Sequence, residues 1–389
     1  MELMTSPKKL FIITGSRAEY GILKNLIKEL KKDKYFKTDV IVTGMHLSKE
    51  FGFTINEILK DKIKVKKKIN INLNSDKPYG ISKSTGTGII KFSKFFSRKR
   101  PDLVIVLGDR FEILAACTAA YFHRIPVAHL HGGESTEGLI DEGIRHSITK
   151  MSHIHFVSTK KYKKKVIQLG ESPKNVHLVG AIGIESIKKN KYLSKNFLEK
   201  KLKIKFAKKN ILVTFHSVTL ENNTSKTQFE NLLFSLKKLK DTNIFFTKTN
   251  SDTFGRVINR LTDSFVKKNS NCFVFKSLGS QNYLSIIKFV DLVVGNSSSG
   301  IIEVPSFKIP TINIGDRQKG RVQASSTINC KPISKDITRS INKAYSPKFK
   351  KKLSNLNNPY DNGLTSLKII KQLKKKNLST LIKKKFHEI

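Results

Sequence analysis

Residues 103–133 read LVIVLGDRFEILAACTAAYFHRIPVAHLHGG and indicate the fold class of this chain. Two short apolar runs, Leu103–Leu107 and Val127–Leu130, lie on either side of Phe111–Ala120, which reads as a helix. A strand, a helix and a second strand in this order are typical of a parallel sheet. We therefore predict an α/β fold in which strands alternate with helices.

The same alternation recurs along the chain and predicts two domains. The other predicted strands are Leu10–Thr14, Asp39–Thr43, Ile154–Ser158, Val176–Val179, Ile211–Phe215, Ile244–Lys248, Cys272–Phe275, Leu292–Val294 and Thr311–Ile314. A chain of 389 residues exceeds what one core usually supports, and a polar, lysine-rich stretch over 188–210 predicts the boundary. We predict an N-terminal Rossmann-like domain over 1–187, a C-terminal one over 188–362, and a helix over 363–389 that packs on the N-terminal domain.

Glycines and reactive side chains follow several of these strands. The sequences are GSR at 15–17, GDR at 108–110, HS at 216–217 and GNSSSG at 295–300. In open α/β sheets the ligand crevice lies at the carboxyl ends of the strands. Because both halves show this pattern, we predict two Rossmann-like domains that face each other across a cleft.

Residues 129–155 read HLHGGESTEGLIDEGIRHSITKMSHIH and contain five of the ten histidines of the chain. Acidic side chains and Arg145 lie among them. Such groups can donate and accept protons near neutral pH, so the segment predicts an acid–base active site. Residues 136–150 read as an amphipathic helix with Ile140, Ile144 and Ile148 on its buried face. Its i,i+4 pairs, 141 with 145 and 142 with 146, have surface salt bridging as the structural alternative.

For the histidines of this segment and for Asp109 the sequence leaves alternatives open. The spacings His-x-His at 129–131 and at 153–155 also suit metal ligands, but the carboxylates and histidines suffice for proton transfer without a metal. His153 and His155 are equally compatible with a place in the core. Asp109 is either the N-cap of the following helix or a catalytic carboxylate.

The loop at 295–300 predicts an anion site. Backbone N–H groups at a helix N-terminus bind phosphate, and serine hydroxyls add donors. Arg17, Arg317 and Arg321 each follow a glycine-containing turn, from which a guanidinium can pair with diphosphate. Glu303, one turn into the predicted helix, can accept hydrogen bonds from a ribose; the alternative is an ordinary capped helix start with a first-turn acid.

The bulk composition bounds the partners. The net charge of +44 would suit nucleic acid or an anionic membrane, yet lysine is scattered along the whole chain and no interleaved aromatic pattern marks a stacking platform. We therefore attribute the charge to biased composition and expect neither nucleic acid nor membrane as a partner. Three widely spaced cysteines and the absence of an apolar leader at the N-terminus predict a cytoplasmic protein.

Six stretches together resemble the hydrolysing UDP-N-acetylglucosamine 2-epimerases of sialic-acid biosynthesis. They are TGSRAEYG (14–21), GDRFE (108–112), the histidine-rich segment with its following Phe (129–156), NSD (250–252), GNSSSGIIE (295–303) and NIGDRQKGR (313–321). They occur in order over most of the chain. The resemblance implies a fold like that of B-type glycosyltransferases, with the nucleotide bound mainly by the second domain. We expect neither a cofactor nor a metal.

The resemblance also implies a reaction and its residues. UDP-N-acetylglucosamine and water would give UDP and free N-acetylmannosamine, by anti elimination of UDP to a glycal and hydration with inversion at C2. The acids and bases around the sugar would be Asp109, Glu134, Asp141 and Glu142, assisted by His131 and His146. The substrate-binding residues would be Arg17, Arg110, His216, Asn250, Ser297, Ser298, Gly300, Glu303, Arg317 and Arg321.

Related families supply the alternatives. A non-hydrolysing sister family carries glutamate where His131 stands, so we predict release of free sugar. A close branch of the hydrolysing enzymes acts on UDP-2,4-diacetamido-2,4,6-trideoxyhexoses, and a B-type glycosyltransferase is the rival from another class. Ser217 replaces a family proline, which predicts a looser hold on His216, and Leu107 replaces a histidine found in some members. The partners would be a UDP-sugar and further copies of the chain in a dimer or tetramer.

Overall fold

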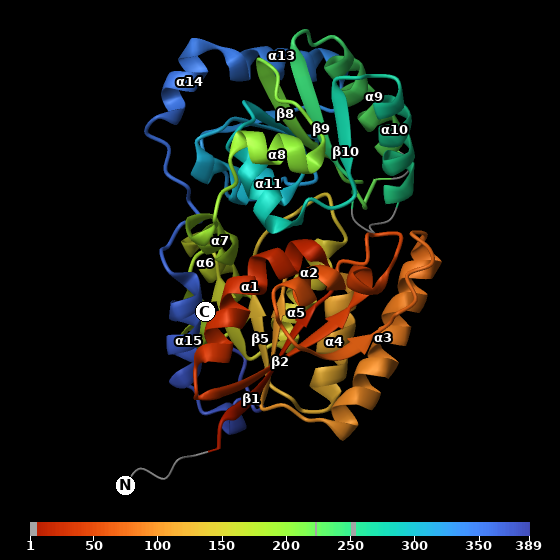
Figure 1. Cartoon of the computed structure of the whole chain (residues 1–389). Coiled ribbons are helices and arrows are strands. Elements are labelled where there is room, and N and C mark those ends of the chain that lie inside the picture. The colour runs from red at the N-terminus through yellow and green to blue at the C-terminus, as the bar shows by residue number, and fades with distance from the viewer. Residues whose placement is uncertain (1–5, 222–223, 250–253) are drawn as a thin grey trace. The chain divides into compact units, whose positions relative to one another are not determined.

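The computed structural model describes residues 6–221, 224–249 and 254–389, which form two compact units (Figure 1). The first unit comprises the chain up to Glu134, Asp141–Ser186 and Asn362–Ile389. The second unit comprises Ser135–Ile140 and Ile187–Asp361. Each unit contains one parallel sheet, so the predicted α/β class with two Rossmann-like domains is confirmed. One feature differs from the predicted continuous domain over 1–187, because residues 135–140 belong to the second unit.

The sheet of the first unit has seven parallel strands in the order β3-β2-β1-β4-β5-β6-β7. The strands are β1 (Lys8–Thr14), β2 (Phe36–Thr43), β3 (Val65–Ile69), β4 (Leu103–Leu107), β5 (Val127–Leu130), β6 (Ile154–Val157) and β7 (Val176–Leu178). The strand order reverses between β1 and β4. In such sheets a crevice opens at this switch point, outside the carboxyl ends of the two strands.

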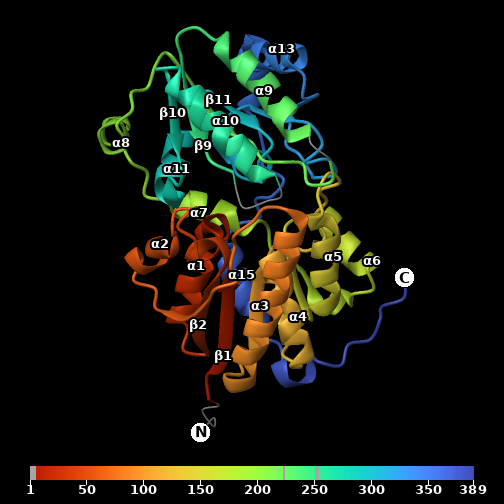
Figure 2. The same ribbon diagram turned by 90° about the vertical axis from the view of Figure 1, so that its right-hand side faces the viewer.

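Helices cover both faces of this sheet (Figure 2). They are α1 (Arg17–Lys32), α2 (Ile55–Lys60), α3 (Pro78–Arg98), α4 (Phe111–Phe122), α5 (Asp141–Met151), α6 (Lys160–Gln168), α7 (Ile182–Lys189) and α15 (Thr365–Lys374), with 3₁₀ turns η1 (Gly44–Leu47), η2 (Pro173–Asn175) and η4 (Leu378–Thr380). Alternate strand residues point to opposite faces. Ile12 of β1 packs in the cluster that holds α1 and α15, whereas Phe11 packs in the cluster that holds α3 and α4.

The second unit repeats the plan with six parallel strands in the order β10-β9-β8-β11-β12-β13. Its strands are β8 (Lys209–Thr214), β9 (Thr242–Thr247), β10 (Cys272–Phe275), β11 (Leu292–Gly295), β12 (Thr311–Ile314) and β13 (Thr327–Cys330). Its helices are α8 (Lys195–Leu202), α9 (Thr224–Lys237), α10 (Gly255–Lys267), α11 (Gly279–Ile287), α12 (Ser298–Ile302), α13 (Ser334–Tyr345) and α14 (Pro347–Leu353), with the 3₁₀ turn η3 (Val304–Phe307). Here the switch point lies between β8 and β11.

Two strands and two helix boundaries differ from the sequence predictions. The unpredicted strands β3 and β13 are edge strands, and β3 has the lysine-rich sequence VKKKI. Residues 136–140 precede α5 instead of forming its first turn, and Ile140 is exposed. The predicted helix over 363–389 is helical only over Thr365–Lys374. Beyond it, the chain runs on through η4 to a non-helical end.

The last residues of the chain pack within the first unit, near Gly170 and Glu171. Lys384 Nζ donates to both carboxylate oxygens of Glu171, at 2.8 and 2.9 Å, and to the carbonyl of Ser152. Lys150 Nζ lies 2.7 Å from the same carboxylate, and His387 N–H donates to the carbonyl of Gly170. We call residues 383–389, which make these contacts, the C-terminal strap. Within the described ranges, no helix is long and apolar enough to cross a bilayer.

Candidate active site

The switch point of the first sheet brings together the two loops GSR and GDR. Ser16 caps α1 through the N–H of Glu19, so that Arg17 is the first residue of the helix and is half-buried. The loop is compact, because a Cβ at Gly15 would lie 2.6 Å from Cγ of Glu112. Glu112 accepts from Nε of Arg110 at 2.8 Å. The carboxylate thus fixes Arg110 beside the GSR loop.

A second buried carboxyl group lies beneath the same loop. Oε2 of Glu19 accepts from the N–H of Gly15 at 2.6 Å. Burial raises the pKa of Glu19, and the negative charge of Glu112 raises it further. Neither Glu19 nor Glu112 was singled out from the sequence. The TGSRAEYG and GDRFE motifs contain them, but only the fold shows that the two motifs are neighbours.

Arg145 of α5 is the centre of the acidic cluster. Its side chain is 1% exposed and donates through Nε to Oδ2 of Asp109 at 2.7 Å. Nη1 donates to Oε2 of Glu142 at 2.7 Å and to the carbonyl of Glu134 at 2.7 Å. Asp109 is therefore an ion-pair partner, and the N-cap alternative is wrong, since α4 begins at Phe111 with Arg110 as its cap residue. Arg145 organises the site, although we did not predict it as a site residue.

Two histidines lie against carboxylates in this cluster. Nδ1 of His131 is 2.9 Å from Oε1 of Glu134, which also accepts from the hydroxyl of Ser158 at 2.9 Å. His131 has a left-handed backbone, with φ of 66°, a strained conformation that is often found at functional sites. Nε2 of His146 is 3.2 Å from Oε1 of Glu142, the predicted i,i+4 pair. Each pair joins a carboxylate to an imidazole, an arrangement that can pass a proton.

The remaining histidines of the segment have structural partners. His129 is fully buried between the carbonyl of Gly108, at 2.7 Å, and the hydroxyl of Thr149, at 3.2 Å. Burial lowers its pKa to about 3, so it stays neutral. His155 Nε2 is 3.0 Å from Glu171, and burial lowers the pKa of His153 to about 4. Within the described ranges, no three His, Cys, Asp or Glu side chains are grouped as metal ligands.

Asp141 is the first residue of α5 and is half-buried. The six residues before it, Ser135–Ile140, pack within the second unit, and we call them the crossing segment. Glu137 N–H donates to the carbonyl of Lys319, and Leu220 N–H donates to the carbonyl of Gly138. Ile140 N–H donates to Oγ1 of Thr219 at 3.0 Å. The crossing segment is thus hydrogen-bonded to the NIGDRQKGR loop and to the chain after β8.

His216 is held firmly at the switch point of the second sheet. Asn296 accepts from the N–H of His216 at 2.7 Å and donates to its carbonyl at 2.8 Å. The ring nitrogen Nδ1 lies 3.1 Å from Oγ1 of Thr249. We predicted that Ser217, in place of the family proline, would loosen the hold on His216. This prediction is wrong, because the side chain of Asn296 hydrogen-bonds to both the N–H and the carbonyl of His216. Leu107, which replaces a histidine found in some members of the family, is buried in the core.

Asn296 also joins His216 to the NIGDRQKGR loop at 313–321, which we call the arginine loop. Its carbonyl accepts from Nη1 of Arg317 at 3.2 Å and from Nε2 of Gln318 at 2.9 Å. Gly295 precedes it with φ of +140°, and a Cβ there would lie 2.0 Å from the carbonyl oxygen of Thr214, so only glycine fits. Asn296, Gln318 and Thr249 were not predicted. Asn296 and Gln318 lie in the GNSSSG and NIGDRQKGR motifs, which is a signal, whereas Thr249 lies outside the motifs.

The serine loop forms a short helix start. Ser297 caps α12 and accepts from the N–H of Ser299, Ser298 is half-buried, and Gly300 packs on Thr311. Because α12 ends at Ile302, Glu303 closes the helix instead of lying one turn inside it, which corrects the sequence prediction. Arg321 is half-buried in the arginine loop. Asn250 lies outside the described residues.

Comparisons with known proteins identify similar sequences and structures. A family model described as UDP-N-acetylglucosamine 2-epimerase matches residues 28–374. The GDP/UDP-N,N'-diacetylbacillosamine 2-epimerase (hydrolyzing) of Campylobacter jejuni is 43% identical, with 99% of this chain and 100% of that protein covered. Polysialic acid biosynthesis protein P7 of Escherichia coli is 42% identical, with 95% of each chain covered.

A solved structure has the same fold. It is the UDP-GlcNAc 2-epimerase of Neisseria meningitidis bound to UDP-GlcNAc, which superposes with a TM-score of 0.81. The superposition covers 95% of this chain and 100% of that chain at 21% sequence identity. At this identity the likeness is one of fold, and it extends over both parallel sheets.

Proposed function

This chain belongs to the UDP-N-acetylglucosamine 2-epimerase family, and we propose that it is a hydrolysing 2-epimerase that releases UDP and a free sugar inverted at C2. The observation that carries the proposal is the Arg145 cluster at the first switch point. It holds Asp109, Glu134 and Glu142 around one buried guanidinium. The hydrolysing relative of 43% identity supports release of the free sugar.

The chemistry requires an acid–base cluster of this kind. The C2–H lies on the carbon that bears the acetamido group and is a poor acid, so its removal must be coupled to departure of a stabilised leaving group. One carboxylate of the cluster takes the C2 proton, and the C–H electron pair forms the C1=C2 bond. The C1–O bond breaks, and its electron pair leaves with UDP. Water then gives its oxygen to C1, and a proton is added to C2 on the opposite face.

The dyads of the cluster suit the proton transfers. His131 with Glu134, and His146 with Glu142, can each hold a proton and return it to the glycal or take one from water. Arg145 pairs with both Asp109 and Glu142 and keeps their carboxylates in place. Asp141 begins the same helix and completes the proposed acid–base set.

We propose that the second unit binds the nucleotide. His216, Arg317 and Arg321 would neutralise the diphosphate, and Arg17 and Arg110 would add positive charge at their own switch point. The backbone around Ser297, Ser298 and Gly300 would donate hydrogen bonds, and Glu303 would accept them from the ribose. The rigid link through Asn296 supports this assignment, because it fixes His216 and Arg317 relative to each other.

Two substrates are supported to similar degrees. One relative is named for diacetylbacillosamine and the other for polysialic acid, and their identities to this chain are 43% and 42%. UDP-N-acetylglucosamine, which would give N-acetylmannosamine, is our first proposal, and UDP-2,4-diacetamido-2,4,6-trideoxyhexose is the second. Both share the 2-acetamido group and the UDP leaving group, so the same cluster serves either.

Proton and phosphorus NMR in D₂O tests the reaction. With UDP-N-acetylglucosamine, we expect UDP and N-acetylmannosamine deuterated at C2. UDP-N-acetylmannosamine as product would contradict hydrolysis and place the enzyme with the non-hydrolysing type. Turnover of only the diacetamido sugar would select the second substrate. Transfer of the sugar to an added acceptor, with retention of C2 hydrogen, would make it a glycosyltransferase.

Substitution of single carboxylates tests the assigned roles. Glu134→Gln and Asp109→Asn should each lower turnover at least about 100-fold, because a proton acceptor or its placement is lost. UDP affinity should change little. Glu137→Gln is the matched control, since this acid of the same segment is exposed and pairs with Lys319. Near-normal turnover of Glu134→Gln or Asp109→Asn with intact UDP binding would remove that residue from the mechanism.

We further propose a cytoplasmic location and a homo-oligomer. Cys117, Cys272 and Cys330 are free thiols, which supports a reducing compartment. A dimer or tetramer follows from the family resemblance alone. Light scattering of the purified chain at several concentrations distinguishes these states from a monomer.

A further inference from the structure

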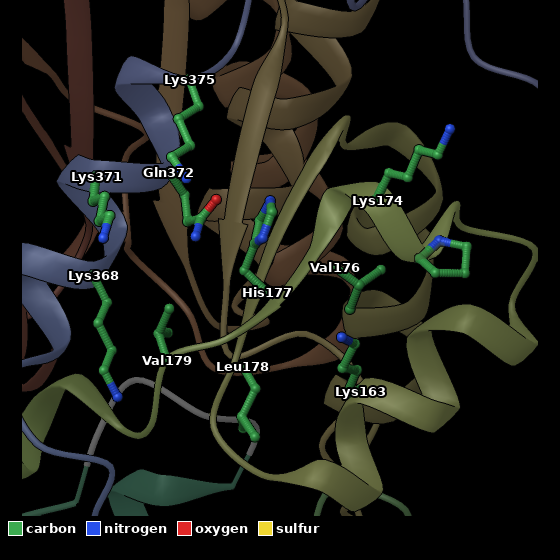
Figure 3. Close-up of a pocket in the computed structure, with 11 residues that line it drawn as sticks. Lys163, Lys174, Val176, His177, Leu178, Val179, Lys368, Lys371, Gln372 and Lys375 are labelled. Carbon is green, nitrogen blue, oxygen red and sulfur yellow. The ribbon is translucent and has the colours of Figure 1, made fainter.

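A separate pocket opens at the edge of the first sheet (Figure 3). The surrounding elements are α6, η2, β7 and α15, and the volume is about 610 Å³. The sheet order places β7 three strands from β4, so the pocket lies at the far edge of the sheet from the switch point. The side chains that line it are cationic, neutral polar or apolar. The acid–base cluster and the nucleotide residues do not contribute to it.

Five lysines line the pocket from two walls. Lys163 of α6 and Lys174 of η2 come from one side, as Figure 3 shows. Lys368, Lys371 and Lys375 come from the other, at positions i, i+3 and i+7 of α15 and its C-cap. This spacing places them on one side of the helix. The opposite side packs into the core of the unit, so the basic stripe is fixed in direction.

These ammonium groups differ from other lysines of the same region. Lys374 pairs with Asp33 at 2.7 Å, and Lys376 donates to Oδ1 of Asn175 at 2.7 Å. Among the residues that the structure describes, none of the five pocket lysines forms an ion pair with a carboxylate, and Lys368 Nζ donates only to the carbonyl of Asn362. Like charges three or four residues apart destabilise a helix by a few tenths of a kcal/mol per pair. A bound anion would remove this repulsion.

The walls are tied together before any ligand binds. Lys376 Nζ donates to the carbonyl of Lys174 at 2.8 Å, which joins the end of α15 to η2. Thr365 Oγ1 donates to the carbonyl of Val179 at 3.1 Å, which joins the start of α15 to the chain after β7. A pocket with fixed walls loses little conformational entropy on binding.

His177 and apolar side chains complete the lining between the two lysine walls. The imidazole packs on Phe156 with ring centroids 5.7 Å apart. Burial and the charges of Lys376 and Lys163 lower the pKa of His177 to about 4, so the ring is neutral at pH 7. A neutral imidazole can donate one hydrogen bond to an anion. Pro173 and Leu178 offer apolar surface to the organic part of a ligand.

We propose that this pocket binds a small molecule that carries adjacent phosphate groups. Lys163 and Lys174 would contact it from one wall, and Lys371 and Lys375 from the other. Lysine is a common phosphate ligand because its ammonium is a compact charge with three donors. The cavity volume is in the usual range for small-molecule sites. The competing explanation is that the lysines only protect the edge strand β7 from aggregation.

Calorimetric titration of the full-length protein with tripolyphosphate tests the proposal. The titration is done at low ionic strength and with saturating UDP, so that the proposed diphosphate site is occupied. Lys163→Gln/Lys371→Gln removes one charge from each wall. Lys267→Gln/Lys268→Gln is the matched control, because it removes the same charge from an exposed stretch of α10 and its C-cap.

We expect one equivalent of tripolyphosphate to bind the wild-type protein. The wall variant should bind it at least about 10-fold more weakly, a loss of about 1.4 kcal/mol, and the control should change less than about 2-fold. Equal weakening in both variants would assign binding to the overall charge and overturn the proposal, as would absence of binding to the wild type. If the wall variant is unstable, the ring proton signals of His177 in the wild type should shift on titration; an unmoved signal would also overturn it.

Discussion

At the residue scale, Arg145 is the group on which the acidic cluster depends. Arg145→Met should lower turnover by about 100- to 1,000-fold, because Asp109 and Glu142 lose their shared partner and Glu134 loses a backbone contact. The free energy of unfolding should fall by about 3–5 kcal/mol, as expected when one member of a buried ion pair is removed. Kinetic assays and urea unfolding of the same preparations measure the two losses.

A conservative variant separates charge from geometry at this position. Arg145→Lys keeps the charge but loses the planar fork, so it should recover part of the stability and little of the turnover. Arg339→Lys is the control, because Arg339 is an exposed arginine with an acid one turn away. Full activity in Arg145→Lys would show that only the charge matters.

Glu19 should make stability depend on pH in the neutral range. Burial, with the charge of Glu112, raises its pKa from 4.5 to about 8 in the folded chain. The folded state then binds more protons than the unfolded state between these values, so stability should fall as pH rises from 4.5 to 8 and level off above. Glu19→Gln should remove this slope and gain about 1–3 kcal/mol at pH 9.

Thermal unfolding from pH 5 to pH 9 measures the difference between Glu19→Gln and the wild type. Glu230→Gln is the control, because Glu230 is an exposed acid beside Lys226. A wild-type slope that persists in Glu19→Gln would assign the effect to another group. The amide can still accept from the N–H of Gly15, so the loop need not change.

At the element scale, the C-terminal strap is held by one ionic group of the first unit. Burial alone would raise the pKa of Glu171, but hydrogen bonds from His155, Lys150 and Lys384 outweigh it and lower the pKa to about 2. Burial lowers the pKa of His155, and its contact with Glu171 opposes that shift. Lys150 and Lys384 add to the hydrogen bond from His155 in keeping Glu171 ionised.

Lys384→Met should release the strap and lower the free energy of unfolding by about 1–3 kcal/mol. Lys383→Met is the control, because Lys383 is exposed and next in sequence. The contribution of Glu171 is present above pH 4.5 and should be lost as pH falls toward 2. Hydrogen exchange of the strap, compared between the two variants, reports its release; equal exchange would contradict this anchor.

The strands that the sequence predicted are apolar, whereas the strands that it missed are more polar and lie at sheet edges. Interior strands such as β4 are apolar on both faces and were found with nearly their observed bounds. The edge strands β3 and β13 lack that signal: β3 has three exposed lysines, and β13 has one buried residue, Ile328. The first turn predicted for α5 failed because residues 136–140 hydrogen-bond to another part of the fold.

The sequence predicted which residues form the acid–base cluster, but it did not predict how they contact one another. The segment over 129–155 indicated which groups carry the chemistry, but not that Arg145 joins Asp109 to Glu142. The partners of Asp109 and Glu112 lie in other motifs, and only the strand order brings those motifs together. Contacts of this kind depend on tertiary structure, which spacing along the chain does not encode.

At the scale of the whole molecule, the chain passes between the two units at residues 134/135, 140/141, 186/187 and 361/362. The first two passages bound the crossing segment, and the proposed catalytic residues Glu134 and Asp141 stand at its ends. A unit with two separate pieces of chain cannot be exchanged between relatives as one block. Recombination at 187 and 361 alone would combine a foreign arginine loop with the native crossing segment.

Chimeras with the Escherichia coli relative test this consequence. A chimera that takes only residues 187–361 from the relative should melt at a lower temperature than either parent if the relative lacks the side chains that pair with the crossing segment, namely Lys319 with Glu137 and Thr219 with the N–H of Ile140. Transfer of residues 135–140 as well should restore the melting temperature. Restoration by residues 135–140 would show that these six residues must be inherited together with the second unit.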